Sequence, residues 1–475
     1  MSFPIPNSNR PCVISLHSER GSFHAASTFP CSVAELYNWH CRPGALERLI
    51  PPWERTTVVS RKGGLDPGGQ VTMRMHAGPI PYLWQALHIE NRPSLYFRDI
   101  QTSGPFRHWL HTHCFAPSPE GACLEDHIEY ALPGQSVLPG LGKLLVEPVL
   151  TRTFRYRHAT LRDDLSLHAY ASQRPLRILI SGASGVLGSA LIPLLSTGGH
   201  EVWRLVRRQP KRSRGEIYWN PAKGLLNLAG LPPFDGVIHL AADNIGQGRW
   251  TKEKKQQVID SRVQGTSLLA QELVRCRHKP EVLLSASAVG FYGDCQDCCI
   301  VEENQAGSAF ISDVCTQWEQ AARPAEDAGI RTVLLRIGVV LTPRGGALAR
   351  LLASSAAGIN RRFGSGQQYI SWIGVHDAIS AMLHALVCKD LQGPVNIVAP
   401  NPVTNSELLG TLAQVLRRPL LPPVPAALVR LIFGQMGAEV LLHGCRVSAD
   451  KLLTSGYRFR HPDLSSALRT LLGKA

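Results

Sequence analysis

Three glycines spaced three residues apart constrain this chain more than any other feature. The stretch LRILISGASGVLG, residues 176–188, places them after an apolar strand-like run and at the start of a helical pattern. In such a unit one glycine allows the tight turn, another admits a pyrophosphate to backbone N–H groups, and the third lets helix and strand pack closely. We expect a dinucleotide-binding turn made by Gly182, Ala183, Ser184, Gly185, Val186, Leu187 and Gly188.

The second strand of the same unit ends in two arginines. In EVWRLVRRQPKR the apolar run stops at Arg207 and Arg208, where an NAD-binding chain normally has an acid for the ribose 2′-hydroxyl. Guanidinium groups suit a 2′-phosphate instead, through charge-assisted hydrogen bonds. The sequence therefore favours NADP over NAD, and two surface arginines without a ligand are the alternative.

The chain changes its pattern near residue 172. Before it, a short helix at 31–40 is followed by strand-like runs separated by Gly, Pro, Asn and Ser, and by a helical pattern at 142–165. After SQRP (172–175), a plausible linker, apolar strands alternate with helices, which is typical of a doubly wound parallel sheet. We predict an α+β domain at 1–172, an α/β Rossmann-like domain at 173–422 and a small helical subdomain at 423–475.

The composition of the chain limits the classes of protein to which it can belong. The 475 residues are 44% hydrophobic and 18% charged, as in a globular protein of two or three domains. No long apolar run predicts a membrane span, and the N-terminus lacks a secretory signal pattern, so we expect a cytoplasmic protein. The net charge of +14 contains no block of like charges, which favours a phosphorylated ligand over nucleic acid. A homo-oligomer is compatible with the sequence, which does not choose its state.

Several motifs of the second part resemble a known family. With SGASGVLG, the segments HLAADN (239–244) and SASAVGFYGD (285–294) resemble an extended or atypical short-chain dehydrogenase/reductase. VCTQWEQAA, LLRIGVVLTPRGGAL and GPVNIVAPNPVTN resemble its epimerase-like, SulA-type subfamily, which ends in a short helical domain. The resemblance spans about residues 176–472 and implies further cofactor contacts at Leu240, Ala241, Ala242 and Arg336.

The first part resembles a different superfamily. WHCRPGALERLIPPWE (39–54), GPFRHWLHTHCF (104–115) and FRYRHATLRDDL (154–165) resemble SRPBCC, or START-like, ligand-binding proteins. The resemblance implies a helix-grip fold with an apolar pocket between a curved sheet and a long helix. We expect a small apolar ligand there, with Trp39, Trp53, Trp84 and Trp109 lining or closing the pocket.

The catalytic residues of the short-chain family are mostly replaced. Its tyrosine transfers a proton while a lysine four residues later lowers the tyrosine pKa. With Glu319 as the register mark, these positions are Ile311 and Cys315, and the usual asparagine is Arg262. Only the serine remains, as Ser285 or Ser287.

Other residues are candidates to replace the missing pair. Tyr292 follows the serine strand and is a substitute proton donor, although a packed loop aromatic is the competing interpretation. We expect an NADP(H)-dependent epimerase/dehydratase-like oxidoreductase of unknown substrate with a fused hydrophobic-ligand pocket. A non-catalytic NADP(H)-binding regulatory protein is the alternative.

Two groups of metal-ligating residues also stand out. His111 and His113 lie on one face of a predicted strand, but the sequence offers no nearby acid or cysteine that completes a ligand set. Cys295, Cys298 and Cys299 have no second pair at zinc-ligand spacing. We therefore predict no metal.

Overall fold

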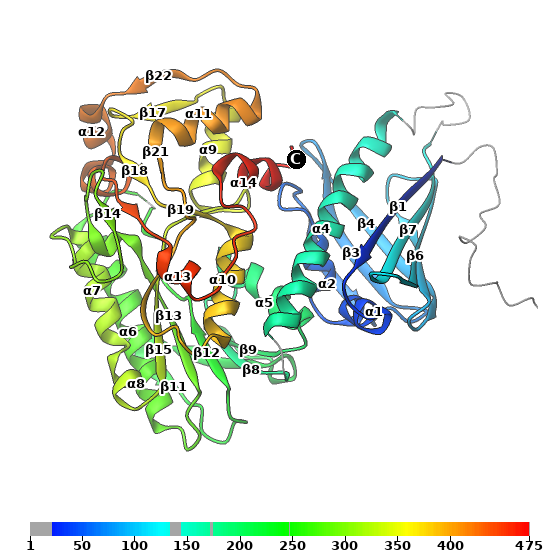
Figure 1. Cartoon of the computed structure of the whole chain (residues 1–475), viewed down its shortest axis with the longest axis horizontal. Helices are drawn as coiled ribbons and strands as arrows, with labels where there is room; N and C mark the ends of the chain where they lie inside the picture. Colours follow the sequence, from blue (N-terminus) through cyan, green and yellow to red (C-terminus); the bar gives the residue numbers. More distant parts are fainter. Residues whose placement is uncertain (1–20, 134–143, 172–173, 247, 475) are drawn as a thin grey trace, which may run out of the picture. The chain divides into compact units, whose positions relative to one another are not determined.

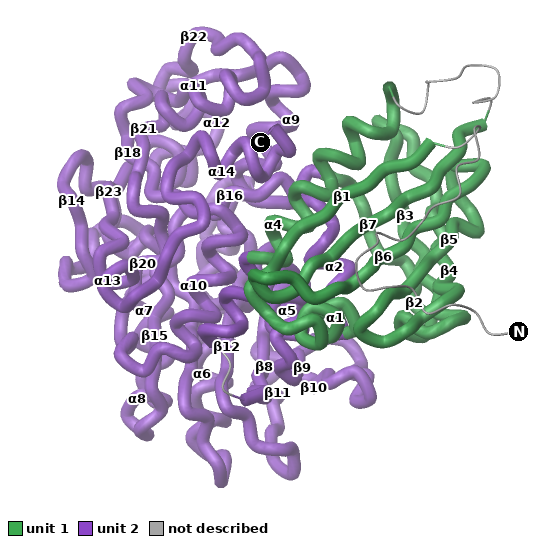
Figure 2. The backbone as a smooth tube through the Cα atoms, turned by 45° about the vertical axis from the view of Figure 1, so that its right-hand side comes forward, with its two compact units in different colours: residues 1–41, 54–162 green, residues 42–53, 163–475 purple. Residues whose placement is uncertain are grey.

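The computed structural model describes residues 21–133, 144–171, 174–246 and 248–474, and the chain divides into two compact units (Figures 1 and 2). Unit 1 comprises residues 1–41 and 54–162, and unit 2 comprises residues 42–53 and 163–475. Part of the expected linker, residues 172–173, lies outside the described residues. The domain boundaries at 172 and 422 stay predictions.

Unit 1 is built on a seven-stranded antiparallel sheet in the order β1-β7-β6-β5-β4-β3-β2. The expected strands are confirmed, but the sequence prediction missed β1, which precedes the first helix and pairs along its whole length with β7. The elements are β1 Gly21–Phe29, α1 Val33–Cys41, β2 Thr57–Lys62, β3 Gln70–Ala77, β4 Ile80–Arg92, β5 Tyr96–Ser103, β6 His108–Ser118, β7 Gly121–Ala131 and α4 Glu147–Ala171.

A long helix packs on one face of this sheet. The ring of Phe154 on α4 lies 5.4 Å from that of Phe23 on β1 and 5.5 Å from the imidazole of His111 on β6. Along β7 the residues alternate between buried and partly exposed, because successive side chains of a strand point to opposite faces. The inner face therefore forms the core of unit 1 against α4.

Unit 2 contains an eight-stranded sheet in the order β11-β10-β9-β8-β12-β13-β15-β20. All its neighbours run parallel except β10 and β11, which confirms the expected doubly wound sheet. The strand order reverses at β8, between β9 and β12, and doubly wound sheets bind their ligands outside the carboxyl ends of the strands at such a point. The strands are β8 Arg177–Ser181, β9 Glu201–Val206, β10 Glu216–Asn220, β11 Leu225–Leu226, β12 Gly236–His239, β13 Val282–Ala288, β15 Arg331–Ile337 and β20 Gly393–Ile397.

Helices cover both faces of this sheet. Ile178 and Ile180 of β8 pack with Leu191 of α5, whereas Leu179 between them packs with Leu269 of α6. In Figure 1, α5 and α10 accordingly lie on one side of the strands, with α6 and α7 on the other. The longer helices are α5 Val186–Thr197, α6 Lys252–Arg275, α7 Phe310–Ala321, α9 Gly346–Ala356, α10 Val375–Val387 and α11 Asn405–Leu416.

The end of the chain is helical, as the sequence predicts. Leu464 and Leu468 of α14 pack against Leu408 and Leu412 of α11. The remaining helices are α2 Ala45–Leu49, α8 Arg323–Asp327, α12 Ala426–Met436, α13 Asp450–Thr454 and α14 Leu464–Leu471. Within the described ranges, none of the helices has both the length and the apolar content to cross a membrane.

Short strand pairs connect the loops of unit 2. They are β14 Cys299–Ile300 with β23 Arg446–Val447, β16 Val339–Leu341 with β19 Trp372–Gly374, β17 Arg361–Phe363 with β22 Leu421–Val424, and β18 Tyr369–Ile370 with β21 Val403–Thr404. The pairs β14 with β23 and β17 with β22 tie segments after β13 and β15 to the start and middle of the helical end of the chain.

Candidate functional site

The glycine turn lies where the strand order reverses, at the carboxyl end of β8. Gly182 has a φ of 71°, and a Cβ added there would come within 2.7 Å of the carbonyl carbon of Leu240. A Cβ on Gly188 would collide with the carbonyl oxygen of Gly182. The N–H of Gly185 closes the turn by donating to that same oxygen at 2.9 Å. The turn therefore requires glycine at 182 for its conformation and at 188 for space.

The start of α5 is open to a ligand. Its N-cap residue is Gly185, and within the described residues no side chain accepts a hydrogen bond from the N–H groups of the first turn. Ser184, Gly185 and Val186 are exposed, while Ala183 and Leu187 are partly exposed. Such unpaired amides at the positive end of a helix dipole suit a phosphate group. The turn thus has the shape and the donors that a pyrophosphate needs.

A hydrogen-bonded pair that the sequence analysis missed fixes the two strand ends beside this turn. The hydroxyl of Ser181 lies 2.7 Å from Nδ1 of His239 and accepts from the backbone N–H groups of Leu240 and Ala241 at 3.1 and 3.2 Å. Burial lowers the pKa of His239 to about 4, so its imidazole is neutral near pH 7. Because the amides of Leu240 and Ala241 serve this contact, Ala242, which is exposed, presents the nearest amide without such a role.

The two arginines after β9 differ in their surroundings. The guanidinium of Arg208 donates two hydrogen bonds, of 2.8 and 2.7 Å, to the carboxylate of Glu216. These bonds lower the pKa of Glu216 to about 2. Arg207 is exposed, and its guanidinium has no hydrogen-bond or ion-pair partner in the described parts of the chain. Arg207 is therefore the one of the two with all its donors available.

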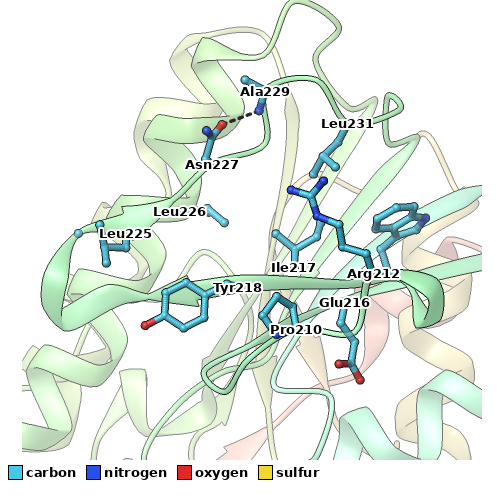
Figure 3. Close-up of a pocket in the computed structure, with 12 residues that line it drawn as sticks. Pro210, Arg212, Glu216, Ile217, Tyr218, Leu225, Leu226, Asn227, Ala229 and Leu231 are labelled. Carbon is cyan, nitrogen blue, oxygen red and sulfur yellow. Dashed lines mark hydrogen bonds between the residues drawn. The ribbon is translucent and has the colours of Figure 1, made fainter.

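A hollow of about 380 Å³ lies near the edge of the sheet, beside β10 and β11 (Figure 3). None of the predicted site residues lines it. Its walls combine apolar side chains with polar and charged ones, and they include Trp203, Ile217, Leu226, Arg212, Glu216 and Asn227. We assign no ligand to this hollow.

The two candidate serines lie on β13 in different settings. The hydroxyl of Ser285 is fully buried and has no hydrogen-bond partner within the described residues. The hydroxyl of Ser287 donates to the carboxylate of Glu319 at 2.6 Å. Ser285 therefore has the hydroxyl that remains available to another group.

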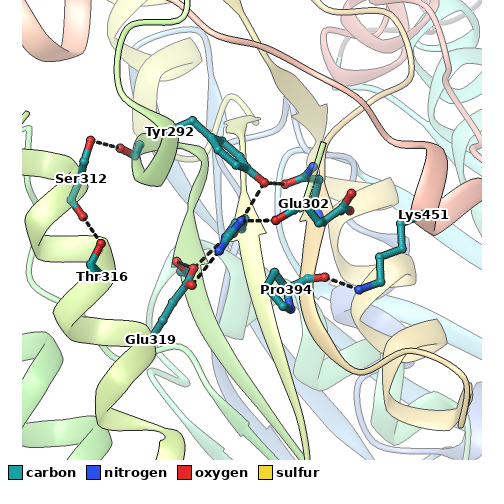
Figure 4. Close-up of polar contacts among 11 residues, drawn as sticks. Tyr292, Glu302, Ser312, Thr316, Glu319, Pro394 and Lys451 are labelled. Carbon is teal, nitrogen blue, oxygen red and sulfur yellow. Dashed lines mark hydrogen bonds and ion pairs between the residues drawn. The ribbon is translucent and has the colours of Figure 1, made fainter. Parts of the chain in front are cut away.

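Tyr292 and Glu319 belong to one network of polar contacts (Figure 4), in which Arg336 bonds to both. The hydroxyl of Tyr292 donates to Asn396 Oδ1 at 2.7 Å and accepts from Arg336 Nη1 at 3.0 Å. Arg336 also donates two bonds of 2.9 Å to Glu319. Burial raises the pKa of Tyr292 to about 12. These contacts favour a structural role for Tyr292 and Arg336 over proton transfer or cofactor binding.

Helix α7, which should carry the tyrosine–lysine pair, has a closely packed and a buried side chain at the two positions. Ile311 packs so closely on Gly290 that a Cβ there would lie 2.7 Å from its Cγ1. Cys315 is 1% exposed, and burial raises the pKa of its thiol to about 12. Neither side chain can exchange a proton near neutral pH.

Arg262 occupies the position at which the family has an asparagine. It contacts Asp243 and Trp318. Its Nη2 donates to the backbone oxygen of Asp243 at 3.1 Å, and its guanidinium lies 4.9 Å from the centre of the Trp318 ring. The carboxylate of Asp243 in turn lies 2.5 Å from Nζ of Lys254. Asp243, just beyond β12, and Lys254, in the first turn of α6, are charged residues that the sequence analysis did not single out.

A doubly wound parallel sheet with a glycine turn at its reversal point defines a Rossmann-type protein. Comparisons with known proteins narrow this class. The sequence profile of the NAD dependent epimerase/dehydratase family matches residues 178–398, and that of the domain of unknown function DUF1731 matches residues 424–471. The chain is 39% identical to epimerase family protein Mb2239 of Mycobacterium bovis over 61% of this chain and 96% of that protein. The chain belongs to the NAD dependent epimerase/dehydratase family.

Two solved structures are similar to this one. A nucleoside-diphosphate sugar epimerase of Corynebacterium glutamicum is 30% identical, with a TM-score of 0.75, and the match covers 95% of this chain and 90% of that one. The human epimerase family protein SDR39U1 (isoform 2), solved with NADPH, is 33% identical with a TM-score of 0.58, over 62% of this chain and 99% of that one. The first match extends well beyond the family region, into the N-terminal part.

Proposed function

We propose that this chain binds NADP(H) across the turn at 182–188 and acts as an epimerase/dehydratase-like oxidoreductase on a substrate yet to be found. The observation that carries the proposal is the open first turn of α5, where the N–H groups have no side-chain acceptor in the part of the chain that the structure describes. The predicted contacts from Ala183, Ser184, Val186 and Leu187 belong to this proposal, as does that from Ala242.

The choice of NADP over NAD depends on the end of β9. The first acid after the two arginines, Glu216, is already bound by Arg208, so it is a poor acceptor for a ribose 2′-hydroxyl. Arg207 has its donors available for a 2′-phosphate. The NADPH in the human relative supports the same choice.

The chemistry on this chain differs from that of the tyrosine–lysine enzymes. A bound nicotinamide supplies or accepts the hydride. Among the predicted catalytic residues we assign the donor role to Ser285, because its hydroxyl has no partner within the described residues; it is fully buried, so donation to a substrate oxygen requires the side chains around it to move. Ser287 and Tyr292 hold Glu319 and Arg336 in place, so we assign them a positioning role.

A second function, NADP(H) binding without turnover, is favoured by one specific observation. The two positions that normally bear the proton donor and its lysine carry Ile311, packed on Gly290, and Cys315, a buried thiol. In this alternative the nucleotide acts as a structural or regulatory signal. Steady oxidation of NADPH by the purified protein with any member of a broad carbonyl panel would exclude it.

For unit 1 we infer a START-like ligand-binding domain. A seven-stranded antiparallel sheet with the long helix α4 packed on its inner face supports this inference. The expected apolar pocket is less supported, because the rings of Trp84 and Trp109 pack edge to face at 4.9 Å in the core. Native mass spectrometry of the purified protein tests for a retained apolar ligand.

The cofactor proposal is tested by titrating the full chain with NADPH and NADH in a calorimeter. Replacing Arg207 with Ala should weaken NADPH binding about tenfold, the value of one charge-assisted hydrogen bond, and leave NADH binding unchanged. Arg430→Ala, at an exposed arginine of α12, is the matched control. If the native protein does not bind NADPH at millimolar concentration, the proposal is wrong.

A further inference from the structure

Unit 1 contains a cluster of two imidazoles between two carboxylates, separate from the nucleotide turn. Asp99 of β5 pairs with His111 of β6, and His113 of β6 pairs with Asp126 of β7. His111 and His113 are two residues apart, so all four side chains share the inner face of the sheet. Their side chains are only 13, 7, 12 and 2% exposed for Asp99, His111, His113 and Asp126.

Each imidazole turns one nitrogen toward each carboxylate. On the Asp126 side, Oδ1 lies 3.0 Å from Nε2 of His111 and 2.7 Å from Nδ1 of His113. On the Asp99 side, Oδ2 lies 3.7 Å from Nδ1 of His111 and 3.8 Å from Nε2 of His113. The short contacts are of hydrogen-bond length and the long ones are not.

This asymmetry fixes the proton of His111. Its Nε2 is hydrogen-bonded to Asp126 and carries the hydrogen, because two lone pairs would repel at 3.0 Å, so Nδ1, which faces Asp99, is unprotonated in the neutral ring. Nδ1 of His113 lies close to Asp126 but makes no hydrogen bond within the described residues, so a ligand can select the tautomer of this ring. With the hydrogen of His113 on Nδ1, two imidazole nitrogens and one carboxylate oxygen converge as acceptors. In the described residues Asp99 makes no hydrogen bond that would satisfy its carboxylate.

We propose that Asp99, His111 and His113 bind a divalent first-row transition metal ion, with zinc as the leading candidate. Two imidazoles and one carboxylate are a ligand set that these ions prefer. Ligand atoms bound to zinc in a tetrahedron stand roughly 3.4 Å apart. The separations of 3.7 and 3.8 Å therefore need to shrink by only a few tenths of an ångström, and all three atoms lie within 4.8 Å of one another.

Asp126 completes the site from the second layer. In metal sites the far nitrogen of a ligating histidine typically donates to a carboxylate, which fixes the ring and raises its basicity. Asp126 accepts such a bond from Nε2 of His111 at 3.0 Å, and Nδ1 of His113 lies 2.7 Å from the same oxygen. Asp126 is held in turn by Nε2 of His158 at 2.7 Å, and Nδ1 of His158 lies 2.9 Å from the hydroxyl of Ser27.

The environment leaves room for chemistry at the ion. Three protein ligands leave one tetrahedral position for water or a substrate. Aromatic rings surround the cluster: that of Phe97 stacks on His113 at 4.1 Å, and that of Phe154 lies 5.5 Å from His111. Arg157 adds one positive charge that acts on Asp99, so with the two carboxylates the cluster keeps one negative charge in excess.

This inference reverses our sequence-based prediction of no metal. That prediction depended on the absence of an acid near His111 and His113 in the sequence. Asp99 and Asp126 are 12 or more residues away along the chain, and only the pairing of β5, β6 and β7 brings them to the histidines.

The test uses the full chain, stripped with a chelator and titrated with Zn²⁺ by calorimetry and with Co²⁺ by visible absorption. We expect one tightly bound ion and the absorption bands of a cobalt site with nitrogen ligands. Asp99→Asn and His113→Gln should each weaken binding at least tenfold and remove the bands. If one of the two variants does not fold, as judged by its unfolding midpoint, the result for the other variant decides the test.

A second group of possible ligands serves as the control. His24, Glu125 and His127 also gather within 4.8 Å of one another. The double variant His24→Gln/His127→Gln should keep the ion and its spectrum. The proposal is overturned if the native protein binds no Zn²⁺ at micromolar concentration, if Asp99→Asn and His113→Gln bind as tightly as the native protein, or if only the double variant loses the ion.

Discussion

Arg336 and Glu319 are joined by two hydrogen bonds of 2.9 Å in the interior of unit 2. Their side chains are only 4 and 10% exposed. The same guanidinium lies 3.6 Å from the centre of the Phe291 ring and donates to the hydroxyl of Tyr292. This pair joins β15 to α7 and, through Tyr292, to the loop after β13.

Breaking this ion pair should therefore destabilise the protein. Glu319→Gln keeps the shape of the side chain but leaves the buried guanidinium without a counter-charge, which costs about 3–5 kcal/mol of unfolding free energy. Urea unfolding measures the loss. Glu201→Gln is the control, since its partner Arg177 is on the surface and such pairs contribute about 1 kcal/mol or less. Equal losses in the two variants would contradict the role given to the pair.

The glycine turn makes a steric prediction. Gly188→Ala places a methyl group against the carbonyl oxygen of Gly182, so we expect a loss of about 1–3 kcal/mol and weaker NADPH binding. Gly410→Ala on α11 is the matched control, because nothing lies within 4 Å of the added methyl. In the interior of a helix that change should stabilise the protein by about 0.5–1 kcal/mol. Thermal unfolding of both variants shows whether the loss comes from the collision at position 188 or from replacing a glycine with alanine.

A Ser285→Ala variant tests the catalytic role of this hydroxyl separately from its effect on stability. Ser285→Ala removes a buried, unpaired hydroxyl, so the unfolding free energy should stay equal or rise by about 1 kcal/mol. If this serine donates to the substrate, turnover of any accepted carbonyl compound should fall about 10- to 100-fold while NADPH affinity is unchanged. Unaltered turnover in this variant would remove Ser285 from the mechanism.

His239 makes the stability of unit 2 depend on pH. Its folded-state pKa is lowered to about 4 by burial, against 6.5 for an exposed histidine. Between these values the unfolded chain binds the extra proton, so stability is complete above pH 6.5 and falls as the pH drops toward 4. The contribution is about 3 kcal/mol. His239→Asn, which still accepts from Ser181, should reduce the slope of stability against pH by about one proton.

The exposed His278 provides the comparison for this measurement. His278→Asn should leave the slope between pH 4 and 6.5 as it is in the native protein. If His239→Asn and His278→Asn behave alike in denaturant titrations across this range, His239 is not the group that titrates.

Short-range features of the sequence determined the framework of unit 2. The glycine spacing at 182–188 indicates a turn in which larger side chains would collide, and this requirement arises within the turn itself. The apolar strands that alternate with helices indicate a sheet that is buried on both faces. The family resemblance therefore followed from local motifs, as did the helical end of the chain. The strand β1 was missed because GSFHAASTF contains few strongly apolar residues, and it is its pairing with β7 that stabilises it.

Tertiary structure alone decided which side chains meet. The sequence places Arg207 and Arg208 side by side, but the return of the chain along β10 brings Glu216 to only the second of them. It sets Tyr292 beside the serine strand, yet folding buries its hydroxyl against Arg336 and Asn396. The histidines of β6 acquire Asp99 and Asp126 only through strand register. Hydrogen bonds and charges act between groups a few ångströms apart in space, and the number of residues between two side chains does not give that distance.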